Sequence, residues 1–165
     1  MSVRCNRGCH HGGLYGATGL LLYRHSSSGE VEILLGQQEG STQYGFTWDT
    51  TRKLWGLYER VDDIVRDQII EKLGLDLKEC VWPTRKLVDD HGGWVHTTFL
   101  AKPKDGFEIS DLKPSTETGI NMEWFKRKDL DNMDLSLTFK TFVENHLDRI
   151  LPPDRDYLLR RLYGQ

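Results

Sequence analysis

The chain has 165 residues, a length that fits a single domain. Hydrophobic residues make up 38% and charged residues 28%, which is the composition of a globular protein rather than a disordered one. The formal net charge is −3, so the charge balance gives no reason to expect binding to a nucleic-acid polymer or to an anionic membrane.

No apolar run approaches the roughly 20 residues that a membrane helix requires. Residues 1–12 form a polar leader without the apolar stretch of a signal peptide. Three cysteines are too few, and odd in number, for a disulfide framework. We therefore expect a cytoplasmic protein that does not contact a membrane.

The first half of the chain predicts a hairpin followed by a helix. Two apolar runs, at 16–25 and 30–38, flank a Ser-Ser-Ser-Gly turn and are typical of a β-hairpin. A polar loop at 39–45 and a short strand at 46–48 follow. Apolar residues then recur at helical spacing over 61–73, and Gly74 is a good helix stop.

The second half predicts more strands and a second helix. The strand-like runs are 80–82, 86–88, 94–101 and 121–126. The last helix covers 139–151 and ends at two prolines, and Asp154 is a candidate cap for a short helix that reaches Leu162. The order of elements predicts one domain over residues 1–165, with 152–165 as a C-terminal extension.

Three stretches then resemble a known family. They are Leu-Tyr-Gly-Ala-Thr-Gly-Leu-Leu-Leu at 14–22, Asp-Asp-His-Gly-Gly-Trp at 89–94, and Glu-Trp-Phe at 123–125. Together with the segment 48–74, they are similar to a bacterial branch of the Nudix hydrolases over residues 13–147. The resemblance implies an α/β fold, the Nudix-type α/β/α sandwich with a mixed β-sheet between helices, in a family where dimers are common.

The signature of that family keeps its spacing here but loses much of its chemistry. Glu59, Glu71 and Gly74 stand at signature positions, whereas Arg52 and Lys53 replace the glycines of a tight turn.

Three further positions are altered. Asp67 replaces the arginine of Arg-Glu, Gln68 replaces its glutamate, and Lys72 replaces the last glutamate. In the family the lost glutamates hold Mg²⁺ or Mn²⁺, and hard cations need anionic oxygen ligands. We therefore expect no cofactor, with Mg²⁺ or Mn²⁺ as the less favoured outcome.

Three explanations of the altered signature stay open. In the first, Arg52, Lys53 and Lys72 replace the metal and hold a phosphate or carboxylate. In the second, a displaced metal site uses carboxylates spaced by four on one helix face, with Glu59 as a further ligand. Its ligands would be Asp67 and Glu71, together with Asp63. In the third, the site is inactive and the protein is a binding module.

Other candidate residues lie outside the signature. The resemblance gives the loop residue Glu117 a role as general base or as a second metal ligand. Otherwise Glu117 is a surface carboxylate. His91, Trp94 and His96 are candidates for binding a flat substrate group, or are ordinary residues of a β-hairpin.

The N-terminal cluster Cys5, Cys9, His10 and His11 offers four zinc-type ligands, or else incidental thiols in a leader.

We expect a Nudix-related hydrolase or a repurposed biosynthetic enzyme that acts on a phosphorylated or nucleotide-like small molecule. Glu59, Glu71 and Glu117 are the expected catalytic residues. The alternative is a non-catalytic module that binds a nucleotide, a metabolite or a partner, and either protein can be a homodimer.

Overall fold

A computed structural model describes residues 2–39, 46–54, 59–69, 73–74, 80–81, 86–108, 121–155 and 162. For residues 38–39, 46–49, 51–54, 67–69 and 80–81 only the backbone is described. The chain divides into two compact units. Unit 1 comprises Met1–Leu21 and Thr51–Gly119, and unit 2 comprises Leu22–Thr50 and Ile120–Gln165. The prediction of one domain stays a prediction.

Unit 1 begins with a small hairpin where the sequence predicted only a polar leader. Strand β1 (Ser2–Arg4) pairs antiparallel with β2 (His10–Gly12). The turn between them closes through the Gly8 amide, which donates to the Cys5 carbonyl at 2.9 Å. Gly8 has a φ of +83°, a conformation that glycine adopts without steric cost.

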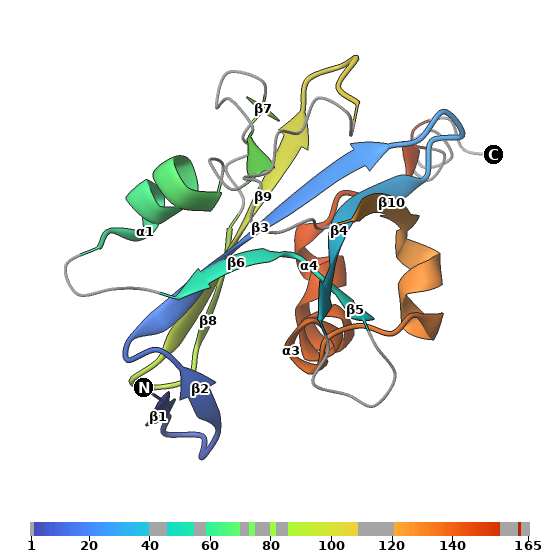
Figure 1. Cartoon of the computed structure of the whole chain (residues 1–165). Helices are drawn as coiled ribbons and strands as arrows, with labels where there is room; N and C mark the ends of the chain where they lie inside the picture. Colours follow the sequence, from blue (N-terminus) through green and yellow to red (C-terminus); the bar gives the residue numbers. More distant parts are fainter. Residues whose placement is uncertain are drawn as a thin grey trace. The chain divides into compact units, whose positions relative to one another are not determined.

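The larger sheet of unit 1 is built on β3 (Gly16–His25) and β9 (Val95–Pro103), which are neighbours. The two arrows run in the same direction (Figure 1). In addition, β3 pairs antiparallel with β6 (Thr51–Leu54), a strand that the sequence did not predict. On its other side β9 pairs antiparallel with β7 (Cys80–Val81) and β8 (Lys86–Asp90).

The predicted helix at 61–73 is confirmed where the structure describes it. It starts as α1 (Val61–Asp63) and continues as the π-helical segment η1 (Ile64–Ile69). Ile64, Val65 and Leu73 are buried, as the apolar periodicity predicted. Gly74 has a φ of +66°, which ends the helix as expected.

Unit 2 contains the predicted hairpin. From Tyr23 to His25, β3 pairs antiparallel with β4 (Val31–Glu39) across the Ser-rich turn. Strand β4 also pairs with β5 (Phe46–Asp49) and β10 (Met122–Lys126). The predicted loop at 39–45 lies outside the described residues except for Glu39, which belongs to β4.

The helical part of unit 2 follows the predicted apolar pattern. Its elements are η4 (Arg127–Asn132), α3 (Leu137–Phe142), η5 (Val143–Leu147) and α4 (Asp148–Ile150). The side chain of Ser136 caps α3 by accepting a hydrogen bond from the Phe139 amide. The apolar residues expected in this helix are all buried: Phe139, Phe142, Val143, Leu147, Ile150 and Leu151.

Asp154 has a different contact from the one predicted. Its carboxylate accepts a hydrogen bond from the Val31 amide at 2.7 Å, at the start of β4. The short helix that it was expected to cap lies mostly outside the described residues. Strands of both polarities together with helical segments make the fold α/β, as predicted. Within the described residues, no helix is long and apolar enough to cross a membrane.

Two leucines of the last helical region test the predicted core. Leu147 is fully buried, whereas Leu137 is 82% exposed. We expect Leu147→Ala to lower the free energy of unfolding by about 2–5 kcal/mol, because it removes buried methyl groups and leaves a cavity. Leu137→Ala should change it by no more than about 0.5 kcal/mol. Urea unfolding of both variants measures the difference, and equal losses would contradict this packing.

Glu30 tests the charges at the turn of the β3–β4 hairpin. Hydrogen bonds from Lys126 and then Lys128 and Ser28 lower the pKa of Glu30 to about 2. A lowered carboxyl pKa stabilises the fold above the ordinary glutamate pKa of about 4.3, and this contribution is lost as the pH falls toward 2. Glu30→Gln should therefore lower the melting temperature at pH 7, by an amount that shrinks as the pH falls below about 4.

The control is Glu144→Gln, which alters an exposed carboxylate on η5. Its effect on the melting temperature should be small at every pH. A Glu30→Gln effect that is independent of pH between 7 and 2 would contradict the ion-pair origin of the stabilisation.

Candidate functional site

The residues at Nudix-signature positions fall into two groups. Glu59 is half-buried and directly precedes Arg60, the N-cap of α1. Arg52 and Lys53 lie in β6, opposite Gly19 and Thr18 of β3, rather than in a tight turn.

The structure describes only the backbone of Arg52, Lys53 and Asp67. Glu71, Lys72 and Glu117 lie outside the described residues altogether. The roles predicted for these positions therefore stay predictions.

The other predicted residues come together at the β8–β9 hairpin. Trp94 is 6% exposed. The His96 ring is stacked with it at a centroid distance of 6.0 Å, and the His91 ring meets it edge-on at 5.6 Å. A third imidazole, from His11 of β2, lies flat against Trp94 at 4.0 Å with an interplanar angle of 8°. Trp94 is thus stacked on a side chain of its own chain.

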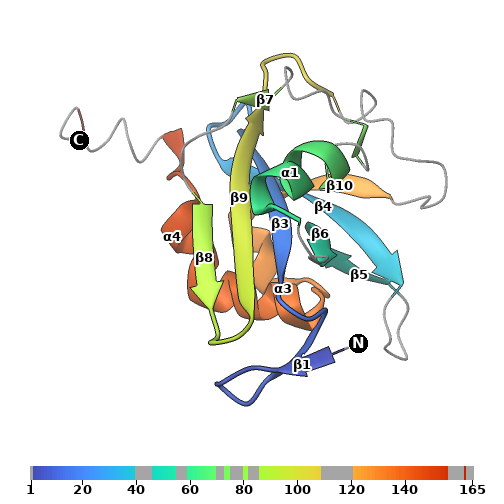
Figure 2. The ribbon, with the colours of Figure 1, turned by 90° about the vertical axis from the view of Figure 1, so that its left-hand side faces the viewer.

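The N-terminal hairpin reaches this position because its turn is fixed to the tip of the β8–β9 hairpin. Figure 2 shows the two at the same end of β9. The backbone amide of Asn6 donates a hydrogen bond to the Gly92 carbonyl at 3.0 Å. The Arg7 guanidinium donates to the Asp89 carboxylate at 3.1 Å and to the Asp90 carbonyl at 2.7 Å.

The indole of Trp94 adds a further link between the two hairpins. Its Nε1 donates to the Gly12 carbonyl at 3.1 Å. Each of these hydrogen bonds joins residues that are far apart in the sequence, so the approach of the two hairpins belongs to the tertiary fold.

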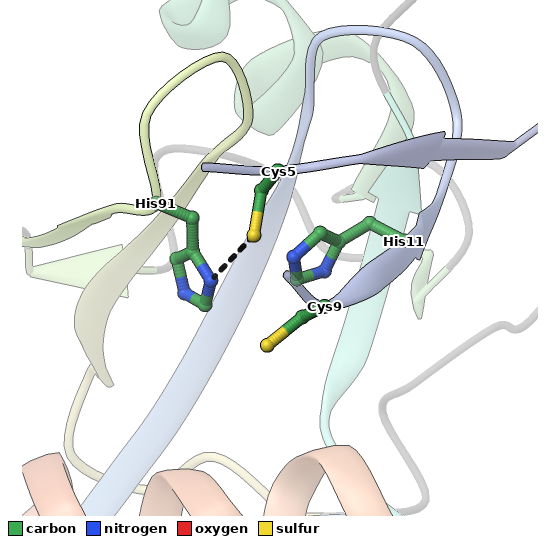
Figure 3. A group of neighbouring side chains, drawn as sticks. All are labelled: Cys5, Cys9, His11 and His91. Carbon is green, nitrogen blue, oxygen red and sulfur yellow. Dashed lines mark hydrogen bonds between the residues drawn. The ribbon is translucent and has the colours of Figure 1, made fainter. Parts of the chain in front are cut away.

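The approach gathers four metal-ligating side chains, those of Cys5, Cys9, His11 and His91 (Figure 3). Their ligand atoms all lie within 4.8 Å of one another. The sequence predicted the two cysteines and His11 but grouped them with His10, which is exposed and lies outside the cluster.

His91, which was predicted to bind substrate, takes the fourth place in the cluster. The alternation of β2 could have excluded His10, because neighbouring strand residues point to opposite faces.

Hydrogen bonds orient the groups of the cluster. The Sγ atom of Cys5 lies 3.9 Å from Nδ1 of His91, while Nε2 of His91 is 2.7 Å from the Asp89 carboxylate. Burial raises the pKa of Asp89, but its hydrogen bond and charge interaction with His91, and then those with Arg7, lower it overall. Asp89 is therefore an anionic acceptor that fixes the ring of His91.

The Cys5 thiol is prepared to ionise near neutral pH. Burial opposes ionisation, but interactions with the His11 side chain, the Cys9 and Arg7 backbone and the His91 side chain lower its pKa to about 6. Thiolate and imidazole ligands suit zinc and similar metals, whereas Mg²⁺ and Mn²⁺ prefer carboxylate oxygens. The cluster thus differs in chemistry from the metal site of the Nudix signature.

Among the comparisons with known proteins, only the comparison of structures gives matches, and these support the fold. No family description matches the sequence, and a search of curated proteins found no match. Among solved structures, the chain is similar to RenU, a Nudix hydrolase from M. smegmatis, with a TM-score of 0.70 and 20% identity. That match covers 90% of this chain and 93% of RenU.

Two further similar structures are more distant. The Ap4A hydrolase of C. elegans has a TM-score of 0.54 at 17% identity, covering 79% of this chain and 94% of its own. The Nudix domain of Shewanella oneidensis NrtR, solved with ADP ribose, has a TM-score of 0.56 at 14% identity, covering 84% of this chain and 90% of its own. The chain therefore has the Nudix fold, as its sequence predicted.

Two adjacent glycines test the contact between the hairpins. Gly92 and Gly93 have φ values of +70° and +84°, so alanine at either position brings backbone strain of about 1–3 kcal/mol. A Cβ atom at Gly92 would also lie 2.6 Å from Nδ2 and 2.9 Å from Cβ of Asn6, whereas one at Gly93 would meet nothing within 4 Å. We expect Gly92→Ala to lower the melting temperature more than Gly93→Ala. Equal effects would contradict the close approach.

Proposed function

We propose that the protein binds a phosphorylated or nucleotide-like small molecule and acts on it as a repurposed Nudix-fold enzyme. The observation that carries this proposal is the Nudix fold, which this chain shares with an Ap4A hydrolase and with a Nudix domain solved with ADP ribose. Both of those ligands contain adenosine and linked phosphate groups. A ligand of this chemical class is the simplest inference for the same fold.

The residues at the signature positions support a reaction that does not use the usual Mg²⁺ or Mn²⁺. Glu59 and Glu71 remain, but Gln68 offers a neutral amide oxygen in place of a carboxylate. Lys72 places a cation where the signature has an anion, and its charge repels a divalent metal. This set of donors does not fit the metal site of the family.

Basic residues supply the positive charge in this proposal. Arg52, Lys53 and Lys72 bind the phosphate groups, because guanidinium and ammonium groups form charge-assisted hydrogen bonds to phosphate oxygens. Glu59, Glu71 and Glu117 provide the acid–base chemistry.

His96, which is half-buried, is the candidate for binding the flat group of the ligand, because Trp94 is buried. His11 already covers part of Trp94, so the phosphate contacts carry most of the affinity.

A second function is a non-catalytic binding module. The loss of two signature glutamates, at Gln68 and Lys72, favours it, because binding can persist after the hydrolytic metal site is lost. The two functions share a ligand class and differ only in turnover.

The test combines binding with turnover. We expect ADP ribose or Ap4A to bind the wild-type protein in calorimetry in a buffer without added Mg²⁺ or Mn²⁺. Lys72→Ala should weaken binding about tenfold or more, because a hydrogen bond to a charged group contributes about 1.5–3 kcal/mol. Lys104→Ala, which alters an exposed residue after β9, is the matched control. Failure of both ligands to bind, or a requirement for Mg²⁺, would contradict the proposal.

Phosphate and pyrophosphate release then separates the enzyme from the binding module. Turnover that Glu59→Gln or Glu117→Gln abolishes supports the enzyme, and tight binding without turnover supports the module. The double variant Gln68→Glu with Lys72→Glu restores the carboxylates of the signature. A gain of Mg²⁺-dependent hydrolysis by this variant would place the signature correctly on the chain.

A further inference from the structure

We propose that Cys5, Cys9, His11 and His91 form a closed zinc site that fastens the N-terminal hairpin to the tip of the β8–β9 hairpin. None of the four ligands stands at a signature position in the sequence, and the inference does not depend on the proposed function. It also assigns His91 to a metal rather than to substrate.

The spacing of the ligand atoms fits a tetrahedral ion after a small contraction. Zinc lies about 2.3 Å from sulfur and about 2.0–2.1 Å from nitrogen, so a tetrahedral S–Zn–N edge is about 3.6 Å long. The Cys5 Sγ to His91 Nδ1 distance is 3.9 Å, and no pair of ligand atoms in the cluster exceeds 4.8 Å. Shifts of about 1 Å or less in side-chain position would complete the coordination.

The two cysteines are held by the turn of the N-terminal hairpin. Cys5 directly follows β1 and Cys9 directly precedes β2, and the Cys5 amide donates to the Cys9 carbonyl at 3.0 Å. The turn brings both thiols to the same end of the hairpin. Cys5 is buried, so a metal bound there would be shielded from water on that side.

A hydrogen bond to a carboxylate orients the ring of His91 toward the cluster. The Nε2 atom of His91 faces the Asp89 carboxylate, which leaves Nδ1 directed at Cys5. A carboxylate behind a histidine is the usual arrangement around metal-bound imidazole, and here Arg7 holds that carboxylate in turn.

His11 shows an unsatisfied nitrogen. Its side chain points toward the other three ligands (Figure 3). Its Nε2 atom is shielded from solvent, and within the described part of the chain it has no hydrogen-bond partner of acceptable geometry. A buried polar atom of this kind ordinarily has a partner, and a metal ion would provide one.

The identity of the ligands selects the metal and the role. Two thiolates and two imidazoles are a common ligand set for structural zinc, and together these four side chains fill all four positions of a tetrahedral ion. No position is left for a reacting water, so the site stabilises the fold rather than performing hydrolysis. A disulfide between Cys5 and Cys9 is the competing state, and it would leave both histidines without a metal.

The first test is the metal content of tag-free protein purified without chelator. We expect about one zinc per chain by mass spectrometry of the metal, as a single tetrahedral site requires. Cys5→Ser, Cys9→Ser and His91→Asn should each lose most of this zinc. The matched controls are Cys80→Ser, which changes the remaining cysteine, and His10→Asn, which changes the exposed neighbour of His11; both should keep it.

The second test uses only the wild-type chain and does not depend on whether the variants fold. Metal-free protein is titrated with Co²⁺, and we expect a tetrahedral Co²⁺ spectrum with thiolate charge-transfer bands that one equivalent of Zn²⁺ removes. Chelation of zinc should also lower the melting temperature, and added Zn²⁺ should restore it.

Three results would overturn the proposal. The first is wild-type protein without zinc that also shows no thiolate band with Co²⁺. The second is a Cys5–Cys9 disulfide in protein purified under reducing conditions, seen in the intact mass. The third is zinc that the Cys5 and His91 variants retain in full, which would identify an adventitious ion.

Discussion

The contact between Asn6 and Gly92 is the constraint on which the N-terminal half of unit 1 depends. The Asn6 side chain occupies the space that a Cβ atom at position 92 would need, so only glycine allows the two hairpins to approach this closely. That approach lets Arg7 reach Asp89 and lets Trp94 reach the Gly12 carbonyl. The aromatic stack and the four-ligand cluster both follow from it.

The chain carries two sets of candidate ligands with opposite chemical character. At the positions that we assign to the Nudix signature, the sequence has the amide of Gln68 and the ammonium of Lys72 where the family has carboxylates. At the hairpins, Cys5 and His91 belong to a cluster of sulfur and nitrogen donors. Because the softness of the ligand atoms selects the metal, our two proposals give one chain weak affinity for Mg²⁺ at the first set and affinity for zinc at the second.

The parts that sequence predicted well are those that depend on local patterns. The β3–β4 hairpin follows from two apolar runs around a turn, and the buried face of 139–151 follows from helical spacing. The cluster depends instead on His91, which is 86 positions from Cys5. No local period encodes a contact between residues so far apart, so sequence placed His10 where the structure has His91. The Asp154–Val31 contact was missed for the same reason.

The separation of Cys5 from His91 also sets the order in which the cluster can form. The turn that holds Cys5 and Cys9 is local and can close as soon as residues 2–12 leave the ribosome, whereas His91 arrives after about 80 further residues at roughly 5–20 residues per second. For those seconds Cys5, Cys9 and His11 lack the fourth member of the cluster, His91. The long separation makes completion of the cluster a late folding event, and a reducing environment would keep Cys5 and Cys9 from forming a disulfide before His91 arrives.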